Sequence, residues 1–335
     1  MSHFRSPVLS GIAAASILCT LTGCTSVQVK MGWKVYLDRT PVKSIEASLP
    51  QGPGIGPGQK SPLVVTFTEP DGKILTTEGK GGGKVMWKEL AATANVVSVN
   101  QKGVVSLARD PRISDGKIGH LTVTVPSHPD LRAELDIPIR YDERYTVNYS
   151  GSQGMDGSNG LDGTNGISGS PGSMDPNNPS AGGNGGDGTD GSNGGDGGNG
   201  GDAPAVQIRM ALQAGGHPLV QISVAAAGKQ KFYLVDPQGG TLTVSADGGR
   251  AGAGGKGGRG GRGGSGGMGT PNGSDGRSGL DGRDGMSGQP GSGGLITVTY
   301  DPQVKPYQSV LHLSSWNGPK PVYTEQPVAA LWQAN

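Results

Sequence analysis

The feature that most constrains this chain is a glycine at every third position in two long tracts. The first tract keeps this period over Gly151–Gly172 and, after a break, over Gly182–Gly200. The second keeps it over Gly249–Gly267 and, after another break, over Gly273–Gly294. The runs hold eight, seven, seven and eight glycines, a near-mirror arrangement. Glycine at period three is typical of an extended helix with three residues per turn, one edge of which is clear enough for another backbone to approach.

Two folded architectures satisfy this period: a collagen triple helix of three chains, and a bundle of polyglycine-II-type helices folded from one chain. The collagen alternative is disfavoured because the runs are short and contain only two prolines, Pro171 and Pro290. The second and third runs are rich in Gly-Gly-X, which clears two edges of a helix, whereas the first and fourth are mostly Gly-X-Y. The breaks contain Pro, Asn and Gly, which are turn residues. We therefore predict four antiparallel helices, with the second and third on the inside.

These tracts are similar to those of polyglycine-II bundle proteins, among them glycine-rich antifreeze proteins and some phage tail-fibre adhesins. Disorder is the alternative, because ordering glycine is entropically costly and such helices have no internal hydrogen bonds. The strict period argues against a plain linker. Charge also argues against it, since residues 151–202 hold seven Asp and no Lys or Arg, whereas residues 249–267 hold four basic residues and no acid. We expect the helix pair of the first, acidic tract to attract the helix pair of the second tract.

The acidic residues of the first tract are candidate metal ligands. Gly-Gly-Asn-Gly-Gly-Asp-Gly over residues 182–188 resembles calcium-binding nonapeptide repeats, but the large apolar residue of those repeats is missing. Calcium bound by Asp187, Asp190 or Asp196 is one interpretation. Solvated carboxylates on an outer edge are the interpretation that we favour, so the sequence predicts no metal and no cofactor.

The region before the first tract, residues 24–150, reads as a β domain. Apolar and polar residues alternate over Val27–Leu37, which predicts a half-buried strand. Further strands are expected at Leu63–Thr68, Ile74–Thr76, Val96–Val99, Val104–Leu107, Leu121–Val125 and Ala133–Ile139. The stretch from Asn95 to Ile139 resembles bacterial Ig-like domains, which implies a β-sandwich. Residues 30–150 are then expected to fold alone.

A second set of β segments flanks the second tract. Strands are expected at Val206–Leu212, Leu219–Ala225, Phe232–Val235, Thr241–Ser245 and Leu295–Tyr300. The predicted fold is mostly β, with an N-terminal Ig-like sandwich followed by a glycine-rich bundle with β segments. Its parts are a signal peptide (1–23), the Ig-like domain (24–150), glycine-rich tract 1 (151–202), a β segment (203–248), glycine-rich tract 2 (249–294) and a β tail (295–335).

The N-terminus has the features of a secretory signal. Arg5 precedes a short apolar stretch that ends in Leu21-Thr22-Gly23-Cys24. This motif resembles the lipobox of bacterial lipoproteins, which implies cleavage before Cys24 and lipid on that cysteine. Thr25 stands where such proteins carry an inner-membrane retention Asp, so the resemblance favours the outer membrane. With its glycine tracts, the chain resembles bacterial collagen-like or glycine-rich surface lipoproteins.

The sequence contains no convincing constellation for catalysis. The histidines of the mature region are single, and no G-x-S-x-G motif is present. Arg259-Gly260-Gly261-Arg262 resembles an RNA-binding RGG box, but a secreted protein is not expected to bind nucleic acid. We therefore expect a non-enzymatic envelope protein for surface display or adhesion, held to the membrane through Cys24, with an unknown protein or glycan partner. A trimeric collagen-like adhesin is the alternative, and a monomer is favoured over a homotrimer.

Overall fold

The computed structural model describes residues 28–29, 31–213 and 215–334, which are mostly β and form five sheets. The chain divides into two compact units. The first unit extends to Leu107 and resumes over Lys117–Pro138, and the second contains Ala108–Gly116 and Ile139–Asn335. Each unit has its own strand pairings.

The first unit contains three small antiparallel sheets. Alternate residues are buried in two of its strands, with Val65 and Phe67 in one and Leu121, Val123 and Val125 in the other, as the sequence predicts. The sheets have the strand orders β1 (Ser44–Ser48), β3 (Val64–Thr68), β4 (Ile74–Thr76); β2 (Lys60–Pro62), β7 (Val104–Leu107), β6 (Val97–Val99); and β5 (Ala91–Asn95), β8 (Gly119–Val125), β9 (His128–Ile137).

The strand predicted over Val27–Leu37 is wrong. Backbone N–H groups of Gly32 and Trp33 donate to the carbonyls of Val29 and Gln28, so the segment turns back on itself instead of pairing along a sheet. Leu37 is fully buried at the start of the short 3-10 helix η1 (Leu37–Arg39), but Trp33 remains 64% exposed. The apolar alternation there reflects a few separate contacts and not the face of a strand.

The second unit has two sheets that share one core. The larger has the order β13 (Lys229–Val235), β12 (Leu219–Ala226), β11 (Val206–Gln213), β15 (Ile296–Tyr300), β17 (Val322–Glu325). The smaller has the order β10 (Arg144–Asn148), β14 (Thr241–Ser245), β16 (Leu311–Ser314), with all its strands parallel. The 3-10 helix η5 (Pro302–Val310) connects β15 to β16 and buries Val304 and Val310 in the same core.

The strand pairings join parts that the sequence analysis separates. Strand β10 lies within the predicted 24–150 domain, but it pairs with β14 and belongs to the second unit. The predicted β segment (203–248) and β tail (295–335) likewise form joint sheets, because β11 pairs with β15 and β14 with β16. The expected strands at Val206–Leu212 and Thr241–Ser245 are present within one residue.

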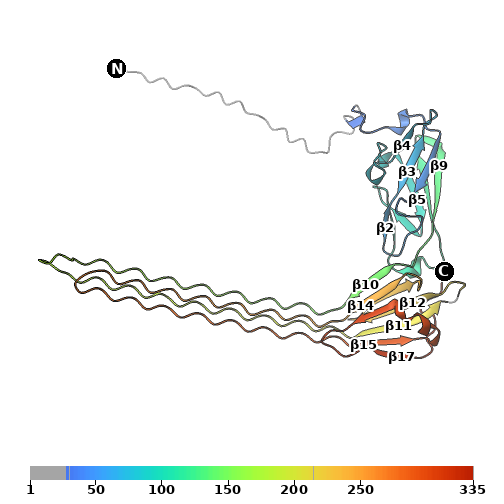
Figure 1. Cartoon of the computed structure of the whole chain (residues 1–335). Helices are drawn as coiled ribbons and strands as arrows, with labels where there is room; N and C mark the ends of the chain where they lie inside the picture. Colours follow the sequence, from blue (N-terminus) through green and yellow to red (C-terminus); the bar gives the residue numbers. More distant parts are fainter. Residues whose placement is uncertain (1–27, 30, 214, 335) are drawn as a thin grey trace, which may run out of the picture. The chain divides into compact units, whose positions relative to one another are not determined.

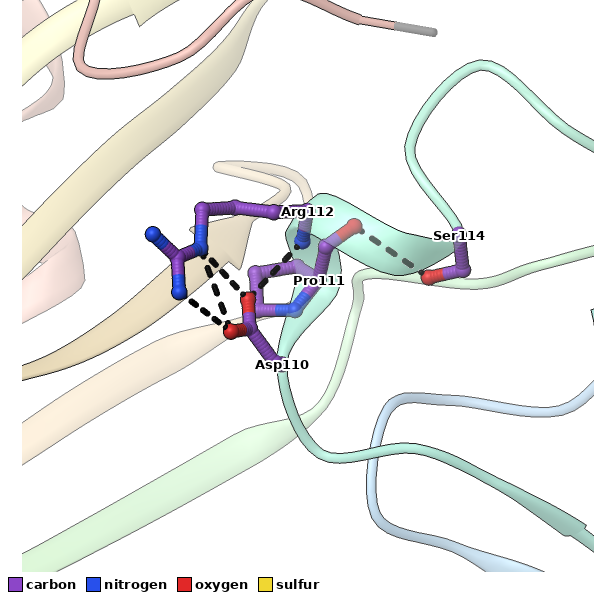
Figure 2. A network of polar contacts seen from close by, with 4 residues as sticks. All are labelled: Asp110, Pro111, Arg112 and Ser114. Carbon is purple, nitrogen blue, oxygen red and sulfur yellow. Dashed lines mark hydrogen bonds and ion pairs between the residues drawn. The ribbon is translucent and has the colours of Figure 1, made fainter.

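Residues 108–116 also belong to the second unit, although both flanking segments belong to the first. Figure 2 shows their polar network: Asp110 accepts a hydrogen bond from the backbone N–H of Arg112 and pairs with its guanidinium at 2.6 Å, at the start of the 3-10 helix η4 (Pro111–Ile113). The Arg112 guanidinium lies 3.8 Å from the centre of the Phe232 ring. Asp115, 1% exposed, accepts hydrogen bonds from Gln213 and from the Trp332 indole at 2.9 and 2.7 Å.

Candidate functional site: the stacked glycine-rich hairpins

The second unit repeats one pattern twice: a strand, a glycine run, a turn, a second glycine run and a strand. Strand β10 leads into run 1 (151–172), and run 2 (182–201) returns to β11. Strand β14 leads into run 3 (248–267), and run 4 (273–294) returns to β15. We call runs 1 and 2 hairpin 1, and runs 3 and 4 hairpin 2. Figure 1 shows the four runs side by side as one long projection from these strands.

Each hairpin is held together by antiparallel backbone hydrogen bonds. In hairpin 1, the N–H of Gly201 donates to the carbonyl of Ser152 at 2.8 Å, and every third residue repeats this as far as Gly183 and Ser170. In hairpin 2, Gly291 donates to Gly249 at 2.9 Å, and the series ends with Gly273 and Gly267. Successive runs are therefore antiparallel, as the sequence predicts.

The two hairpins are joined by three further series of hydrogen bonds. Run 3 donates to run 2, with Gly258 N–H to Ser192 O at 2.9 Å as an example. Run 1 donates to the parallel run 3 (Gly160 to Lys256), and run 2 donates to the parallel run 4 (Gly191 to Leu280). Among the described residues, runs 2 and 3 thus bond to all three other runs, but runs 1 and 4 do not bond to each other. The inner position of runs 2 and 3 is the one that their Gly-Gly-X composition predicts.

The close spacing of the runs explains why glycine recurs in them. A Cβ atom on Gly258 would lie 1.9 Å from the carbonyl oxygen of Leu161, and one on Gly194 would lie 2.2 Å from the carbonyl oxygen of Gly255. Both distances are far below contact distance, and the obstructing atoms are backbone atoms that are themselves hydrogen-bonded. A side chain at either position would have to push two runs apart.

Side-chain oxygens of Asn and Asp form a second, regular set of hydrogen bonds, which we call the Asx ladder. At every third position from residue 184 to residue 202, an Asn or Asp side chain accepts a backbone N–H of run 4, at 2.6 to 2.9 Å. Four residues of run 1 accept N–H groups of run 3 at 2.7 to 2.8 Å. The ladder comprises Asn184, Asp187, Asp190, Asn193, Asp196, Asn199 and Asp202 on the run 2 side and Asp156, Asn159, Asp162 and Asn165 on the run 1 side.

The ladder changes the interpretation of the acidic residues. Asp187, Asp190 and Asp196 are not simply solvated, because each has a carboxylate oxygen on a backbone N–H of run 4. No group of three or more His, Cys, Asp or Glu side chains within the described ranges is placed to hold a metal ion. The regular spacing of Asn and Asp in the sequence is a signal for such a ladder, but the run that donates the N–H groups lies 90 residues away and cannot be read from this spacing.

The expected attraction between oppositely charged hairpins takes a different form. The one ion pair recorded within the described runs joins Lys256 to Asp284, both in hairpin 2, at 2.7 Å. The hydrogen bond from Lys256 and a backbone N–H from Gly257 lower the pKa of Asp284, and the same carboxylate raises the pKa of Lys256. Because both groups are fully exposed, this pair contributes little. The hairpins are joined mainly by backbone and Asx hydrogen bonds.

A third, shortened layer follows the two hairpins. Strands β16 and β17 pair in parallel with β14 and β15, as those strands pair with β10 and β11. They are joined by residues 315–321 in place of a glycine hairpin. Gly248 donates to the Trp316 carbonyl and Gly293 to the Asn317 carbonyl, both at 2.9 Å. This loop therefore accepts hydrogen bonds from the base of hairpin 2, as hairpin 2 accepts them from hairpin 1. We call it the Trp316 cap, since it covers the base of hairpin 2.

An aspartate at the start of run 3 holds the Trp316 cap. Asp247 accepts hydrogen bonds from the Ser314 hydroxyl at 2.5 Å and from the Trp316 N–H at 2.6 Å. The Asn317 side chain donates to the Gly291 carbonyl at 2.7 Å. A cavity of about 260 Å³ beside Asp247, Arg250 and Trp316 is open to solvent. The cap therefore uses side chains where the longer hairpins use repeated backbone bonds.

The two turns lie together at the far end of the projection. Thr270 in the turn 268–272 donates to the carbonyl of Ser180 in the turn 173–181 at 2.9 Å. Gly172 also donates to Met268 across the two hairpins, at 2.6 Å. Met174 and Met268 are 64% and 68% exposed there. The tip is thus a joint surface of both turns.

The predicted lipidation site, Cys24, lies outside the described residues. Within the part that the structure describes, no helix is both long and apolar enough to cross a membrane. No family model and no curated protein matches the chain. The hairpins themselves are therefore the main evidence on function.

Proposed function

We propose that the chain is a lipid-anchored bacterial envelope protein with a structural or interaction role, in surface display or adhesion. In this proposal Cys24 carries the lipid and Thr25 directs the protein to the outer membrane. The glycine runs form a stiff bundle of four polyglycine-II-type helices, which the β units present at the cell surface or in the periplasm. The protein is not an enzyme and needs no cofactor.

The observation that carries this proposal is the unbroken register between sheet and hairpins. Strands β10 and β14 pair in parallel, Tyr149 then donates to Ser245 at 2.8 Å, and Gly151 to Asp247 at 2.9 Å. Strands β11 and β15 continue into runs 2 and 4 in the same way, through Val206 to Leu295 and Ala203 to Ser292. A projection that shares its hydrogen bonds with a sheet is attached rigidly. Rigid attachment is what display at a distance requires.

The bonding pattern favours polyglycine-II helices over collagen. Each run repeats its hydrogen bonds at every third residue and directs them to neighbouring runs, which fits a helix of three residues per turn without internal bonds. At about 3.1 Å per residue, each run is roughly 60 Å long. All the bonds described join runs of one chain, so the bundle needs no second or third chain to form. We therefore favour a bundle folded within one chain over a collagen-like trimer.

The first unit serves in this proposal as an Ig-like stem. Its small antiparallel sheets and the alternating burial of β3 and β8 are the features that support a sandwich. At the other end, the exposed Met174 and Met268 make the tip a candidate contact for a protein or glycan partner, because exposed methionines adapt to varied surfaces.

The anchor is tested by Cys24→Ser, with Cys19→Ser as the matched control. We expect Cys24→Ser to give an unprocessed or soluble protein, because the variant lacks the cysteine that would carry the acyl chains on which membrane retention depends. Cys19→Ser should be processed and retained like the wild type, since Cys19 lies in the predicted leader. Fractionation and mass analysis of the N-terminus provide the measurement. Wild-type retention of a processed Cys24→Ser protein would overturn the proposal.

A further inference from the structure

The four sides of the bundle differ in charge. The side shared by runs 3 and 4 carries Asp275, Asp281 and Asp284, which accept backbone N–H groups of run 3. The two sides along the Asx ladder carry both acids and bases. Basic residues occupy the edges of runs 3 and 4 whose backbone N–H groups donate to the ladder: Arg250, Lys256, Arg259 and Arg262 on run 3, and Arg277 and Arg283 on run 4. Of these, Lys256 reaches Asp284 on the side of runs 3 and 4.

The fourth side, shared by runs 1 and 2, has no charged residue. We call it the uncharged face. Its residues share one edge of each run, because the run 2 members donate their N–H groups to the carbonyls of the run 1 members. It consists of Ser152, Met155, Ser158, Leu161, Thr164, Ile167 and Ser170 on run 1, and of Gly183, Gly186, Thr189, Ser192, Gly195, Gly198 and Gly201 on run 2.

Large apolar side chains stand on this face at regular intervals. Met155, Leu161 and Ile167 follow one another every six residues and are 83%, 79% and 81% exposed. Beside them, run 2 provides a shallow glycine strip, and a side-chain carbon of Ile167 lies 3.3 Å from where Gly186 would carry a Cβ. Run 4 has a shorter row of the same spacing, Leu280 and Met286, but Arg277 and Arg283 stand on the same edge. A row of exposed apolar side chains on a side without charges is the kind of surface that marks an interaction site.

The stacking of the hairpins also leaves this face open. On the opposite side, the Trp316 cap covers the base of hairpin 2. At the base of hairpin 1, the sheet continues instead with β12, which pairs with β11 and places Ala226 opposite Val206. Beyond this base, no described segment outside the bundle forms a backbone hydrogen bond with the residues of the uncharged face.

We propose that the uncharged face binds the same face of a second copy of this chain, in a parallel two-fold pair. A two-fold axis along the runs places run 1 of each copy opposite run 2 of the other, at the same level. Met155 then meets Gly198 and Ile167 meets Gly186, since these residues share a level in the hydrogen-bond series. An antiparallel pair would instead oppose run 1 to run 1, with apolar side chains against each other and glycine against glycine.

The size and charge of the face fit this occupant. At about 60 Å by 10 Å the face offers roughly 600 Å² per copy, close to the ~800 Å² per partner of a stable interface. The other three sides of the bundle carry charges, whose desolvation against an apolar surface is costly. The same face of another copy is uncharged and equally long. Its row of apolar side chains on run 1 fits the glycine strip on run 2 of the first copy, and the reverse contact is equivalent by symmetry.

The mass of the full chain carrying Cys24→Ser, which removes the proposed lipid attachment, tests the pairing. We expect sedimentation velocity to show a concentration-dependent dimer. Leu161→Asp should raise the dissociation constant at least tenfold, because it buries a charge in the interface. The matched control is Leu280→Asp on run 4, where Leu280 is 74% exposed on another side, and it should dimerise like the parent. Met155→Asp repeats the test if Leu161→Asp misfolds by circular dichroism.

The orientation has its own test. In the same chain with Cys19→Ser added, a Leu161→Cys chain mixed with a Ser192→Cys chain should form a mixed interchain disulfide on oxidation, because a parallel pair places Leu161 of one copy opposite Ser192 of the other. An antiparallel pair would instead crosslink each of the two variants with itself. Ser278→Cys, at the matching place in hairpin 2, should not form this disulfide when it replaces Ser192→Cys in the mixture. A parent that stays monomeric at high concentration, or equal effects of Leu161→Asp and Leu280→Asp, would overturn the proposal and leave the face to another occupant. Crosslinking that is as strong through Ser278→Cys would do the same.

Discussion

At the scale of the residue, the Asx ladder needs an oxygen acceptor and not a charge. Asn and Asp occupy equivalent positions along run 2, and Asn193 and Asp196 accept N–H groups at 2.8 and 2.7 Å. The two residue types share one carbonyl-type oxygen at the same place on the side chain. The ladder therefore explains why these positions hold Asn or Asp, whereas charge pairing alone would require Asp.

This equivalence makes a prediction for Asp187, Asp190 and Asp196 together. Changing all three to Asn should leave the free energy of unfolding within about 0.5 kcal/mol of the wild type, because each backbone N–H keeps its acceptor. Changing all three to Ala should lower it by about 2 kcal/mol, since exposed hydrogen bonds contribute roughly 0.5–1 kcal/mol each. Chemical denaturation of the three proteins provides the measurement.

A calcium site at these residues would give the opposite pattern. Calcium prefers carboxylate ligands, so the triple Asn variant would then lose a calcium-dependent rise in melting temperature that the wild type shows. We expect melting temperatures that do not respond to calcium in either protein.

At the scale of the element, the structure sharpens the distinction between glycine positions and the others. Gly258→Val should disrupt the bundle, because its side chain would collide with the carbonyl of Leu161. We expect a loss of at least 3 kcal/mol, as for a severe backbone clash or overpacking. Arg259→Val, at the neighbouring exposed position, should change stability by less than 1 kcal/mol. Thermal unfolding followed by circular dichroism compares the two, and equal tolerance would indicate a disordered tract.

Asn193→Val would not be a neutral control for this comparison. The sequence places Asn193 at an outer X position, but its side chain accepts the N–H of Arg283. Its replacement by Val should cost about the value of one hydrogen bond.

The glycine runs were predictable because their period reports directly on backbone spacing. Gly-Gly-X leaves two edges of a helix without side chains, and Gly-X-Y leaves one. This difference predicts that runs 2 and 3 are inside the bundle and that runs 1 and 4 are outside. Strand β5 was not predicted, because all five residues of Ala91–Asn95 are exposed and leave no apolar alternation. The Trp316 cap was not predicted either, since it repeats a stacking level without repeating any glycine pattern.

The Val27–Leu37 prediction failed for the converse reason. Alternation was present, but in the described part of this segment only Val35 pairs, in a single bridge with Val85, and local turns took up the backbone N–H groups of Gly32 and Trp33. Periodicity reports which side chains can be buried together, but only pairing decides whether a strand forms.

At the scale of the whole molecule, the segment 108–116 matters because it leaves the first unit and returns to it. Asp115 holds it within the second unit through Gln213 and Trp332. We expect Asp115→Ala to lower the stability of the second unit by about 2–3 kcal/mol, because two donors to a buried charged acceptor lose their partner. Hydrogen exchange should quicken in β11, whereas exchange in β8 of the first unit should stay unchanged.

Asp115→Asn is the matched variant, since it keeps one acceptor oxygen and should fall between the wild type and Asp115→Ala. Quickened exchange in β8 to the same extent as in β11 would contradict the assignment of this segment. The same assignment bears on the expectation that residues 30–150 fold alone. That fragment would contain β10 and residues 108–116 without β14, Gln213 or Trp332, their partners in the chain.

The shared register of the four runs has a consequence for how such a chain can change in length. Five series of backbone hydrogen bonds and the Asx ladder join each three-residue repeat of one run to a repeat at the same level in the neighbouring runs. An insertion of three residues in run 1 alone would displace every later level against runs 2 and 3. At levels within the runs, away from the turns at the tip, only insertions or deletions of three residues at the same level in all four runs preserve the pairing. The reach of the projection therefore resists change by any single insertion, and lineages that lengthen it must do so in four places together.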